Sequence, residues 1–178
     1  MVEDYAAVVY DLDGTLVLLD VDWTVVTSEV ADRLADRGVA TTGVDLWTLL
    51  KRAHAAGVGD VAEELVATHE RVGASTSDRL PLADELPRSE PVGVCSLNAE
   101  SAVVQALEHH GLADAVDAVV GRDSVPTQKP HPGPLLTVIT RLGVDPAETL
   151  FVGDSRTDET TAERAGTDFQ YVEERLSS

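Results

Sequence analysis

The stretch Val8-Val9-Tyr10-Asp11-Leu12-Asp13-Gly14-Thr15-Leu16 decides how the rest of the chain is interpreted. The unbroken apolar run that ends at Tyr10 predicts a strand buried on both faces, as in a parallel sheet. Two carboxylates follow where this strand ends, and ligands of open α/β sheets bind outside the carboxyl ends of strands. Gly14 permits a sharp turn close to a ligand, and Thr15 adds a hydroxyl. The alternative interpretation is a plain aspartate-rich turn.

Further strands are expected at 91–96, 118–120, 150–153 and 169–172, because each is a short apolar run bounded by turn residues. Helices with one apolar face are expected between them, at 99–110 and 132–142. Strands that alternate with helices indicate parallel βαβ units with right-handed crossovers. The sequence therefore predicts an α/β fold.

Residues 17–87 interrupt this alternation with a block of three amphipathic helices, and no strand is expected before Pro91. We expect the helices to pack on one another, with Trp23 and Trp47 in their small core. Residues 75–91 are polar and proline-marked, which predicts a return linker with one short helix near 82–86. The expected apolar stripes are Val26, Val30 and Leu34; Leu46, Leu49, Leu50 and Ala53; and Val61, Leu65, Thr68, His69 and Val72.

Three later motifs fall at predicted strand or helix ends. Ser96 ends the second strand, Lys129-Pro130 precedes a helix, and Gly153-Asp154-Ser155-Arg156-Thr157-Asp158 follows the fourth strand. Each also has a simpler interpretation: a capping serine, a proline suited to a first helical turn, and an acidic helix N-terminus favoured by the helix dipole. The motifs gain weight because they occur together and in order.

The series Asp-x-Asp-Gly-Thr, Ser, Lys-Pro and Gly-Asp-x-x-x-Asp resembles the haloacid dehalogenase (HAD) superfamily of phosphohydrolases. The resemblance implies a doubly wound, five-stranded parallel sheet in the spatial order 3-2-1-4-5, with a small helical cap inserted after the first strand. The core domain would comprise residues 1–16 and 88–178, and the cap with its return linker residues 17–87. One departure is visible, because the family often has Asn directly after the serine, where this chain has Leu97 and then Asn98.

The carboxylates at this site would repel one another unless a cation lay between them. Oxygen ligands with retained water suit Mg²⁺. The resemblance implies that Asp11, Asp154 and the main-chain carbonyl of Asp13 bind Mg²⁺ directly, and that Asp158 binds it directly or through water.

The same resemblance gives the remaining roles. Asp11 would attack phosphorus to form an aspartyl-phosphate, and Asp13 would protonate the leaving oxygen and later deprotonate water. Lys129 would supply positive charge to Asp11 and to the phosphoryl oxygens. The phosphate contacts would come from Thr15, Ser96 and Asn98.

The expected activity is therefore Mg²⁺-dependent hydrolysis of a small phosphorylated metabolite, with phosphoglycolate first by family association and a nucleoside monophosphate next. Lys51, Arg52 and His54 of the cap could also face the site. Alternatives are a sugar-phosphate mutase, for which the stretch after the first motif offers only Asp20 and Asp22, and a catalytically silent scaffold that binds other proteins. A dehalogenase is disfavoured by Asp13, and a phosphotransfer receiver domain by the order of its motifs. The oligomeric state is not indicated.

Composition and charge limit the possible binding partners and the cellular compartment of the protein. The net charge of −19 excludes nucleic-acid binding through a basic surface. No apolar run approaches the roughly 18 residues that would cross a bilayer, and the acidic Met1–Asp4 segment does not resemble a signal peptide. A single cysteine, Cys95, fits a reducing compartment. We therefore expect a cytoplasmic protein without a membrane partner.

The acidic residues outnumber the basic ones by 32 to 13, and only Lys51 and Lys129 are lysines. This composition resembles that of proteins from halophilic archaea, whose acidic surfaces remain dissolved in concentrated salt. The alternative is an ordinary acidic protein.

Salt is therefore expected to stabilise the fold. At 0.01 M salt the Debye length is roughly 30 Å, so the negative charges repel one another across the whole molecule. Dialysis into low salt should lower the melting temperature, and molar KCl should restore it. A melting temperature that does not change with KCl, followed by circular dichroism, would contradict the halophilic interpretation.

Overall fold

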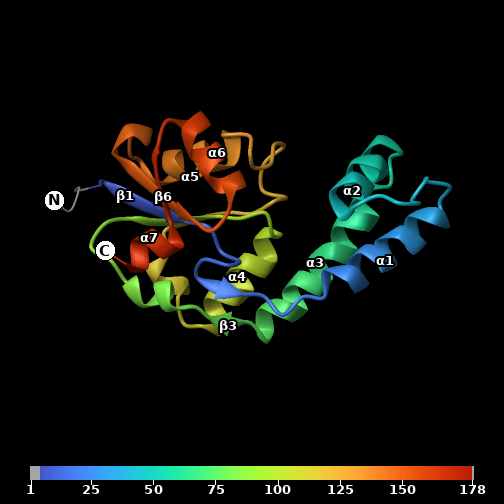
Figure 1. The fold of residues 1–178 in the computed structure, drawn as a ribbon, viewed down its shortest axis with the longest axis horizontal. Helices are drawn as coiled ribbons and strands as arrows, with labels where there is room; N and C mark the ends of the chain where they lie inside the picture. The colour runs from blue at the N-terminus through green and yellow to red at the C-terminus, as the bar shows by residue number, and fades with distance from the viewer. Residues whose placement is uncertain (1–4, 178) are drawn as a thin grey trace.

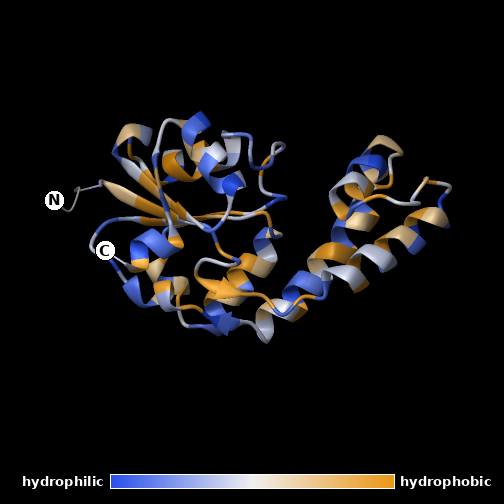
Figure 2. Ribbon diagram, in the orientation of Figure 1, coloured by the Kyte–Doolittle hydropathy of each residue, from blue (hydrophilic) through white to orange (hydrophobic). Residues whose placement is uncertain are grey.

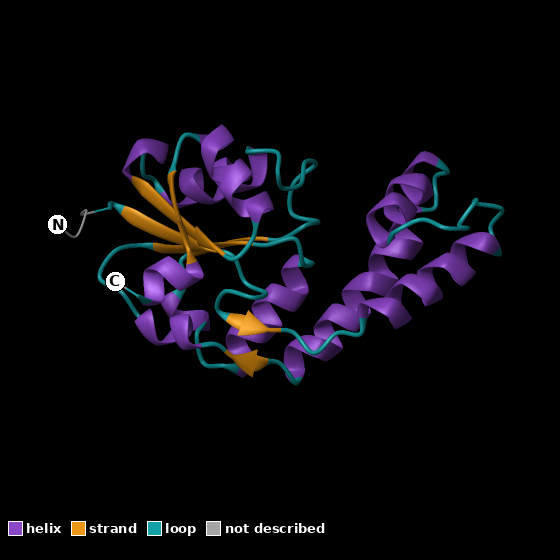
Figure 3. Cartoon of the chain, viewed as in Figure 1, coloured by secondary structure: helices purple, strands orange, loops and turns teal. Residues whose placement is uncertain are grey.

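The computed structural model describes residues 5–177, so the expectation about Met1–Asp4 lies outside the described residues. Its centre is a five-stranded parallel sheet with the order β5-β4-β1-β6-β7 (Figure 3). This order is the predicted one, with the first strand in the middle. The strands are β1 (Ala7–Tyr10), β4 (Val92–Cys95), β5 (Ala118–Val120), β6 (Thr149–Gly153) and β7 (Asp168–Tyr171).

Helices cover both faces of the sheet (Figure 1). The two helices on one face are α4 (Glu100–His109) and α7 (Val172–Leu176), and those on the other are α5 (Gly133–Leu142) and α6 (Arg156–Ala165). Val8 and Tyr10 of β1 point into one apolar cluster and Val9 points into the other. The apolar colour of the central strands in Figure 2 reflects this burial on both faces.

The inserted helices form a third apolar cluster of their own, at the other end of the molecule (Figure 1). They are α1 (Trp23–Ala35), α2 (Leu46–Ala55) and α3 (Gly59–Ser75). The stripes predicted for the first two helices are buried in this cluster, from Val26 to Leu34 and from Leu46 to Ala53. Mutual packing of the inserted helices is therefore confirmed.

The expectation of no strand before Pro91 is wrong. Strands β2 (Val17–Leu18) and β3 (Asp78–Arg79) form an antiparallel pair where the chain leaves and re-enters the core. Each has two residues, too few for an alternating pattern to be read. The expected short helix of the linker is present as a 3₁₀ turn at Pro81–Glu85, and two further 3₁₀ turns occur at Ala113–Ala115 and Pro146–Glu148.

The predicted stripe of α3 is wrong in part, because Leu65 packs against the third apolar cluster but Thr68 is exposed. Val72 is 63 % exposed, and the buried face instead carries small residues and one carboxylate: Gly59, Ala62, Val66, Ala67, Glu70, Gly73 and Ala74. Small residues are needed because the backbone comes close to other segments; a Cβ on Gly73 would collide with the carbonyl of Asp20. This face packs against α4, so α3 joins the inserted helices to the core.

The two tryptophans do not lie in the core of the inserted helices. Trp23 is 36 % exposed and Trp47 is 40 % exposed. Trp23 is the first residue of α1, and Trp47 lies beside the buried stripe of α2, so neither is enclosed by helix packing. Both border the cavity that Asp11 also lines.

Within residues 5–177, none of the helices combines the length and the apolar composition required to cross a bilayer.

Candidate active site

A cavity of about 410 Å³ lies between the carboxyl edge of the sheet and the inserted helices. We call it the central cavity. Asp11 directly follows β1, and Asp158 lies in the first turn of α6, which follows β6. Because parallel strands end at the same edge, residues far apart in sequence meet there. The predicted site residues that line the cavity are Asp11, Asp13, Asn98, Lys129 and Asp158.

Lys129 is buried and holds three segments together. Its Nζ donates to Asp11 Oδ1 at 3.0 Å, to the carbonyl of Cys95 at 3.1 Å and to Asp158 Oδ1 at 2.5 Å. Burial alone would lower the pKa of Lys129, but the two carboxylates raise it above its usual value. The lysine is therefore charged, and all three of its N–H donors are in use.

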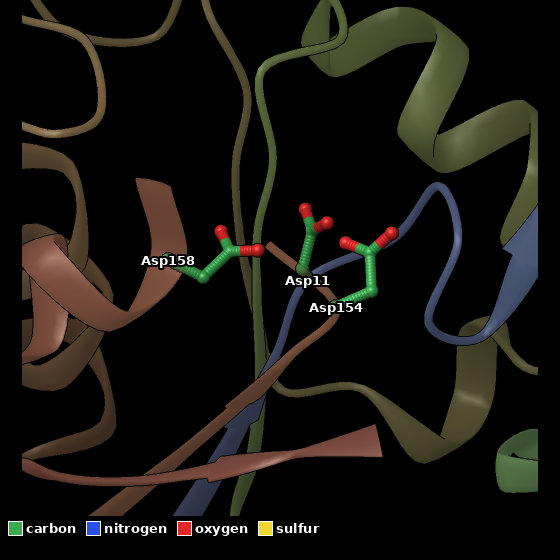
Figure 4. Close-up of side chains that lie close together, drawn as sticks. All are labelled: Asp11, Asp154 and Asp158. Carbon is green, nitrogen blue, oxygen red and sulfur yellow. The ribbon is translucent and has the colours of Figure 1, made fainter. Parts of the chain in front are cut away.

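Asp11, Asp154 and Asp158 form an acidic cluster, with one oxygen of each within 4.8 Å of the others. Figure 4 shows Asp11 between the other two side chains. Burial raises the pKa of Asp11 to about 7, although Lys129 opposes this shift. Burial and the neighbouring Asp158 also raise the pKa of Asp154. One lysine does not neutralise three carboxylates, so the cluster favours a cation.

Gly14 allows the first loop to approach this cluster. Its φ of 82° is in the left-handed region, and a Cβ there would collide with the Asp154 carboxylate. In the same loop, the backbone N–H of Leu19 donates to Asp13 Oδ1 at 2.9 Å and so orients that carboxyl. Burial raises the pKa of Asp13. Thr15 Oγ1 is buried without a hydrogen-bond partner among the described residues, and Thr15 does not line the central cavity.

Ser96 and Asn98 are hydrogen-bonded to each other, and of the two Asn98 lines the central cavity. Ser96 Oγ donates to Asn98 Oδ1 at 2.9 Å. Asn98 Nδ2 in turn donates to Glu70 Oε1 of α3 at 3.2 Å, and the Ala99 N–H donates to Glu70 Oε2 at 2.9 Å. The inserted helices therefore support the loop after β4.

Glu70 is completely buried and forms an ion pair with Arg122, which follows β5. Arg122 Nη1 lies 2.7 Å from Glu70 Oε1, and its Nε lies 2.9 Å from Glu63 Oε2 of the same helix. This ion pair was not among the interactions predicted from the sequence. In the structure Glu70 is four residues after the buried Val66 and shares its helix face, where an unpaired charge would be costly.

The three cap residues singled out from the sequence lie apart from the central cavity. Lys51 and His54 line an adjoining hollow of about 520 Å³, which shares Trp47, Leu97 and Lys129 with the central cavity. Arg52 lines neither; its Nη1 donates to the carbonyl of Ala40 at 2.6 Å.

Comparison with known proteins agrees with this geometry. Residues 84–172 match the family described as haloacid dehalogenase-like hydrolase. A phosphoglycolate phosphatase from Rhodospirillum rubrum is 36 % identical over 90 % of this chain and 76 % of its own. A second, from Shigella boydii, is 32 % identical over 92 % and 79 %. The solved structure of a HAD-superfamily hydrolase of subfamily IA from Geobacter sulfurreducens has a TM-score of 0.60 at 26 % identity, over 92 % of this chain and 86 % of its own.

Proposed function

Because the chain belongs to the haloacid dehalogenase-like hydrolase family, with relatives that are phosphatases, we propose that it hydrolyses small phosphomonoesters through a covalent intermediate on Asp11. The single observation that carries this proposal is the contact of Asp11 with Lys129 beside two further carboxylates. A carboxylate can attack an anionic phosphate only where positive charge is held close by. Lys129 supplies one positive charge, and the acidic cluster would attract a cation that supplies more.

The donor set fits Mg²⁺. Its side-chain donors are oxygens, the acidic cluster carries more negative charge than Lys129 balances, and a side chain at position 14 would fill the space beside Asp154. Asp11, Asp154 and the Asp13 carbonyl would hold the ion, with Asp158 bound directly or through water. When bound, the ion would neutralise charge on the phosphoryl oxygens and on the attacking carboxylate.

The chain's own residues would carry out two displacements. An oxygen of Asp11 bonds to phosphorus as the ester P–O bond breaks, and Asp13 gives its proton to the leaving alcohol oxygen. Asp13 then takes a proton from water as that water attacks the aspartyl-phosphate, which releases phosphate and restores Asp11. The raised pKa of Asp13 suits this exchange. A carboxyl group with a raised pKa keeps its proton at a higher pH, so it is still able to donate that proton to the leaving oxygen.

We assign a phosphate contact to Asn98, which lines the cavity, and a supporting role to Ser96, whose hydroxyl donates to Asn98. A phosphate contact of Thr15 stays a prediction, because its unpaired hydroxyl is buried and Thr15 does not line the cavity. We favour hydrolysis over a mutase reaction. Asp22 accepts hydrogen bonds from the first turn of α1, and Asp20 Oδ2 accepts one from Thr76 Oγ1, so both carboxylates have structural partners. Neither lines the central cavity.

We also propose that residues 1–16 and 88–178 act as the core domain and residues 17–87 as the cap. The separate apolar cluster of α1, α2 and α3 supports this division. A halophilic source stays a prediction, to be tested by the dependence of the melting temperature on KCl.

Removing the metal is expected to abolish turnover. With EDTA, hydrolysis of 4-nitrophenyl phosphate should stop, because the acidic cluster would repel the substrate phosphate. Excess Mg²⁺ or Mn²⁺ should restore the activity. KCl added to the same ionic strength should not restore it. The release of nitrophenol, followed by absorbance, measures this; undiminished turnover in chelator would rule out the metal-dependent mechanism.

A further inference from the structure

The cap side of the central cavity is an aromatic wall. Trp23 and Trp47, the chain's only tryptophans, come from different helices and both line the cavity that Asp11 borders. Each is more than a third exposed. Indole rings left open beside reacting groups provide flat apolar surfaces on which another ring can stack.

The charge around this wall is negative. Lys129 is the one cationic side chain that lines the cavity within residues 5–177, and its three N–H donors are already taken. Asp45 also lines the cavity. Hydrogen bonds from the backbone and the hydroxyl of Thr48 lower the pKa of Asp45, so its carboxylate is ionised at neutral pH. A carboxylate on the leaving group would find no counter-charge here.

We propose that the site takes phosphomonoesters whose leaving group carries a flat, uncharged ring, as in a nucleoside monophosphate, and discriminates against leaving groups that carry a carboxylate. The ring lies against the wall that Trp23 and Trp47 form together while the phosphate lies at Asp11. The cavity volume of about 410 Å³ accommodates a ring-bearing group, within the range of small-molecule sites. This inference rests on the proposed phosphatase function and specifies its substrate class.

The alternative hypothesis is that the preferred substrate has a leaving group with a carboxylate, and that this carboxylate binds in the adjoining hollow. Besides the shared Lys129, two side chains that line that hollow, Lys51 and His54, can carry positive charge, and His54 Nε2 already lies 3.3 Å from Glu63 Oε1. Lys51 would then be the residue that binds the carboxylate. The two readings predict opposite substrate preferences, so kinetics can separate them.

The test compares kcat/KM for three substrates on the full chain with Mg²⁺: adenosine 5′-monophosphate, 2-hydroxyethyl phosphate and phosphoglycolate. The last two have similar chain lengths and differ in the carboxylate. We expect the nucleotide to exceed 2-hydroxyethyl phosphate by about tenfold or more, as stacking of one base implies, and phosphoglycolate to be the slowest. Trp23→Leu and Trp47→Leu should lower kcat/KM for the nucleotide more than for 2-hydroxyethyl phosphate. The control Lys51→Gln should leave all three values unchanged.

Intrinsic fluorescence gives a second measurement that does not depend on turnover. Because both tryptophans line the cavity, adenosine 5′-monophosphate added to the Asp11→Asn variant should change the emission saturably. Phosphoglycolate at the same concentrations should change it little. Each Trp→Leu variant should retain the melting temperature of the parent, which separates loss of stacking from loss of folding.

The inference is overturned if phosphoglycolate is the best substrate and Lys51→Gln removes that preference, or if the tryptophan variants slow all three substrates equally. Failure of the proposed function looks different: 4-nitrophenyl phosphate would then not be hydrolysed with Mg²⁺ present at all.

Discussion

Replacing Asp11 by asparagine is expected to reduce kcat for phosphomonoester hydrolysis by roughly 10⁴-fold or more, because removal of a nucleophile leaves only the binding groups. The variant also loses a proposed metal ligand, and it should form no covalent intermediate. Mass spectrometry of the acid-quenched reaction should find phosphate on the peptide that contains Asp11 in the parent enzyme, and none in the variant.

Asp13→Asn is the matched comparison, since Asp13 is two residues away and its main-chain carbonyl is retained. With an activated aryl phosphate, whose leaving group needs no proton, the first displacement should survive. Water attack has then lost its base and should slow by roughly 10²–10⁴-fold. The signature is a stoichiometric burst of aryl alcohol from Asp13→Asn and none from Asp11→Asn. The reverse pattern, or phosphate on Asp13, would mean that the two roles are exchanged.

Glu70→Gln is expected to lower the free energy of unfolding by about 3 kcal/mol, because Arg122 would remain buried without its main counter-charge. Side-chain exposure is 1 % for Arg122 and 0 % for Glu70, so water cannot replace the lost partner. Glu63, which is 20 % exposed, retains one contact with Arg122 and limits the loss. Urea denaturation at a fixed KCl concentration measures the change.

The chain supplies its own control on the same helix. Glu64 Oε1 lies 2.7 Å from Arg71 Nη2, the same separation as in the buried pair, but its side chain is 70 % exposed. Glu64→Gln should therefore leave the denaturation midpoint unchanged within error. If both substitutions shift the midpoint equally, burial is not what makes the Glu70–Arg122 pair important.

The strand order was predicted through the family resemblance and is confirmed. That Asp11 and Asp154 lie at one edge of the sheet could be predicted from the sequence itself, and the reason is local. Asp11 and Asp154 each follow an unbroken apolar run, and parallel strands bring such ends to one edge. Lys129 could be placed from its motif, through the family resemblance.

The contribution of the inserted helices could not be predicted in the same way. In α3 the buried face is marked by Ala62, Ala67 and Gly73, which apolar periodicity weights lightly, and by Glu70, which it counts as exposed. The partner of Glu70 is 52 residues away, and its position becomes known only once the sheet is assembled. The prediction for Trp23 and Trp47 was wrong in the opposite direction. Large apolar side chains were expected to be buried, but both are more than a third exposed.

The Glu70–Arg122 pair has a consequence for engineering by module exchange. A chimaera that keeps residues 1–16 and 88–178 but receives a foreign helical insert would inherit Arg122 without Glu70 and Glu63. The graft would also remove the acceptor for Asn98 and for the Ala99 amide, so the recipient loop would lose its support. Libraries of exchanged inserts from relatives should therefore vary position 122 together with the insert, and treat the arginine and its two glutamates as one transferable unit.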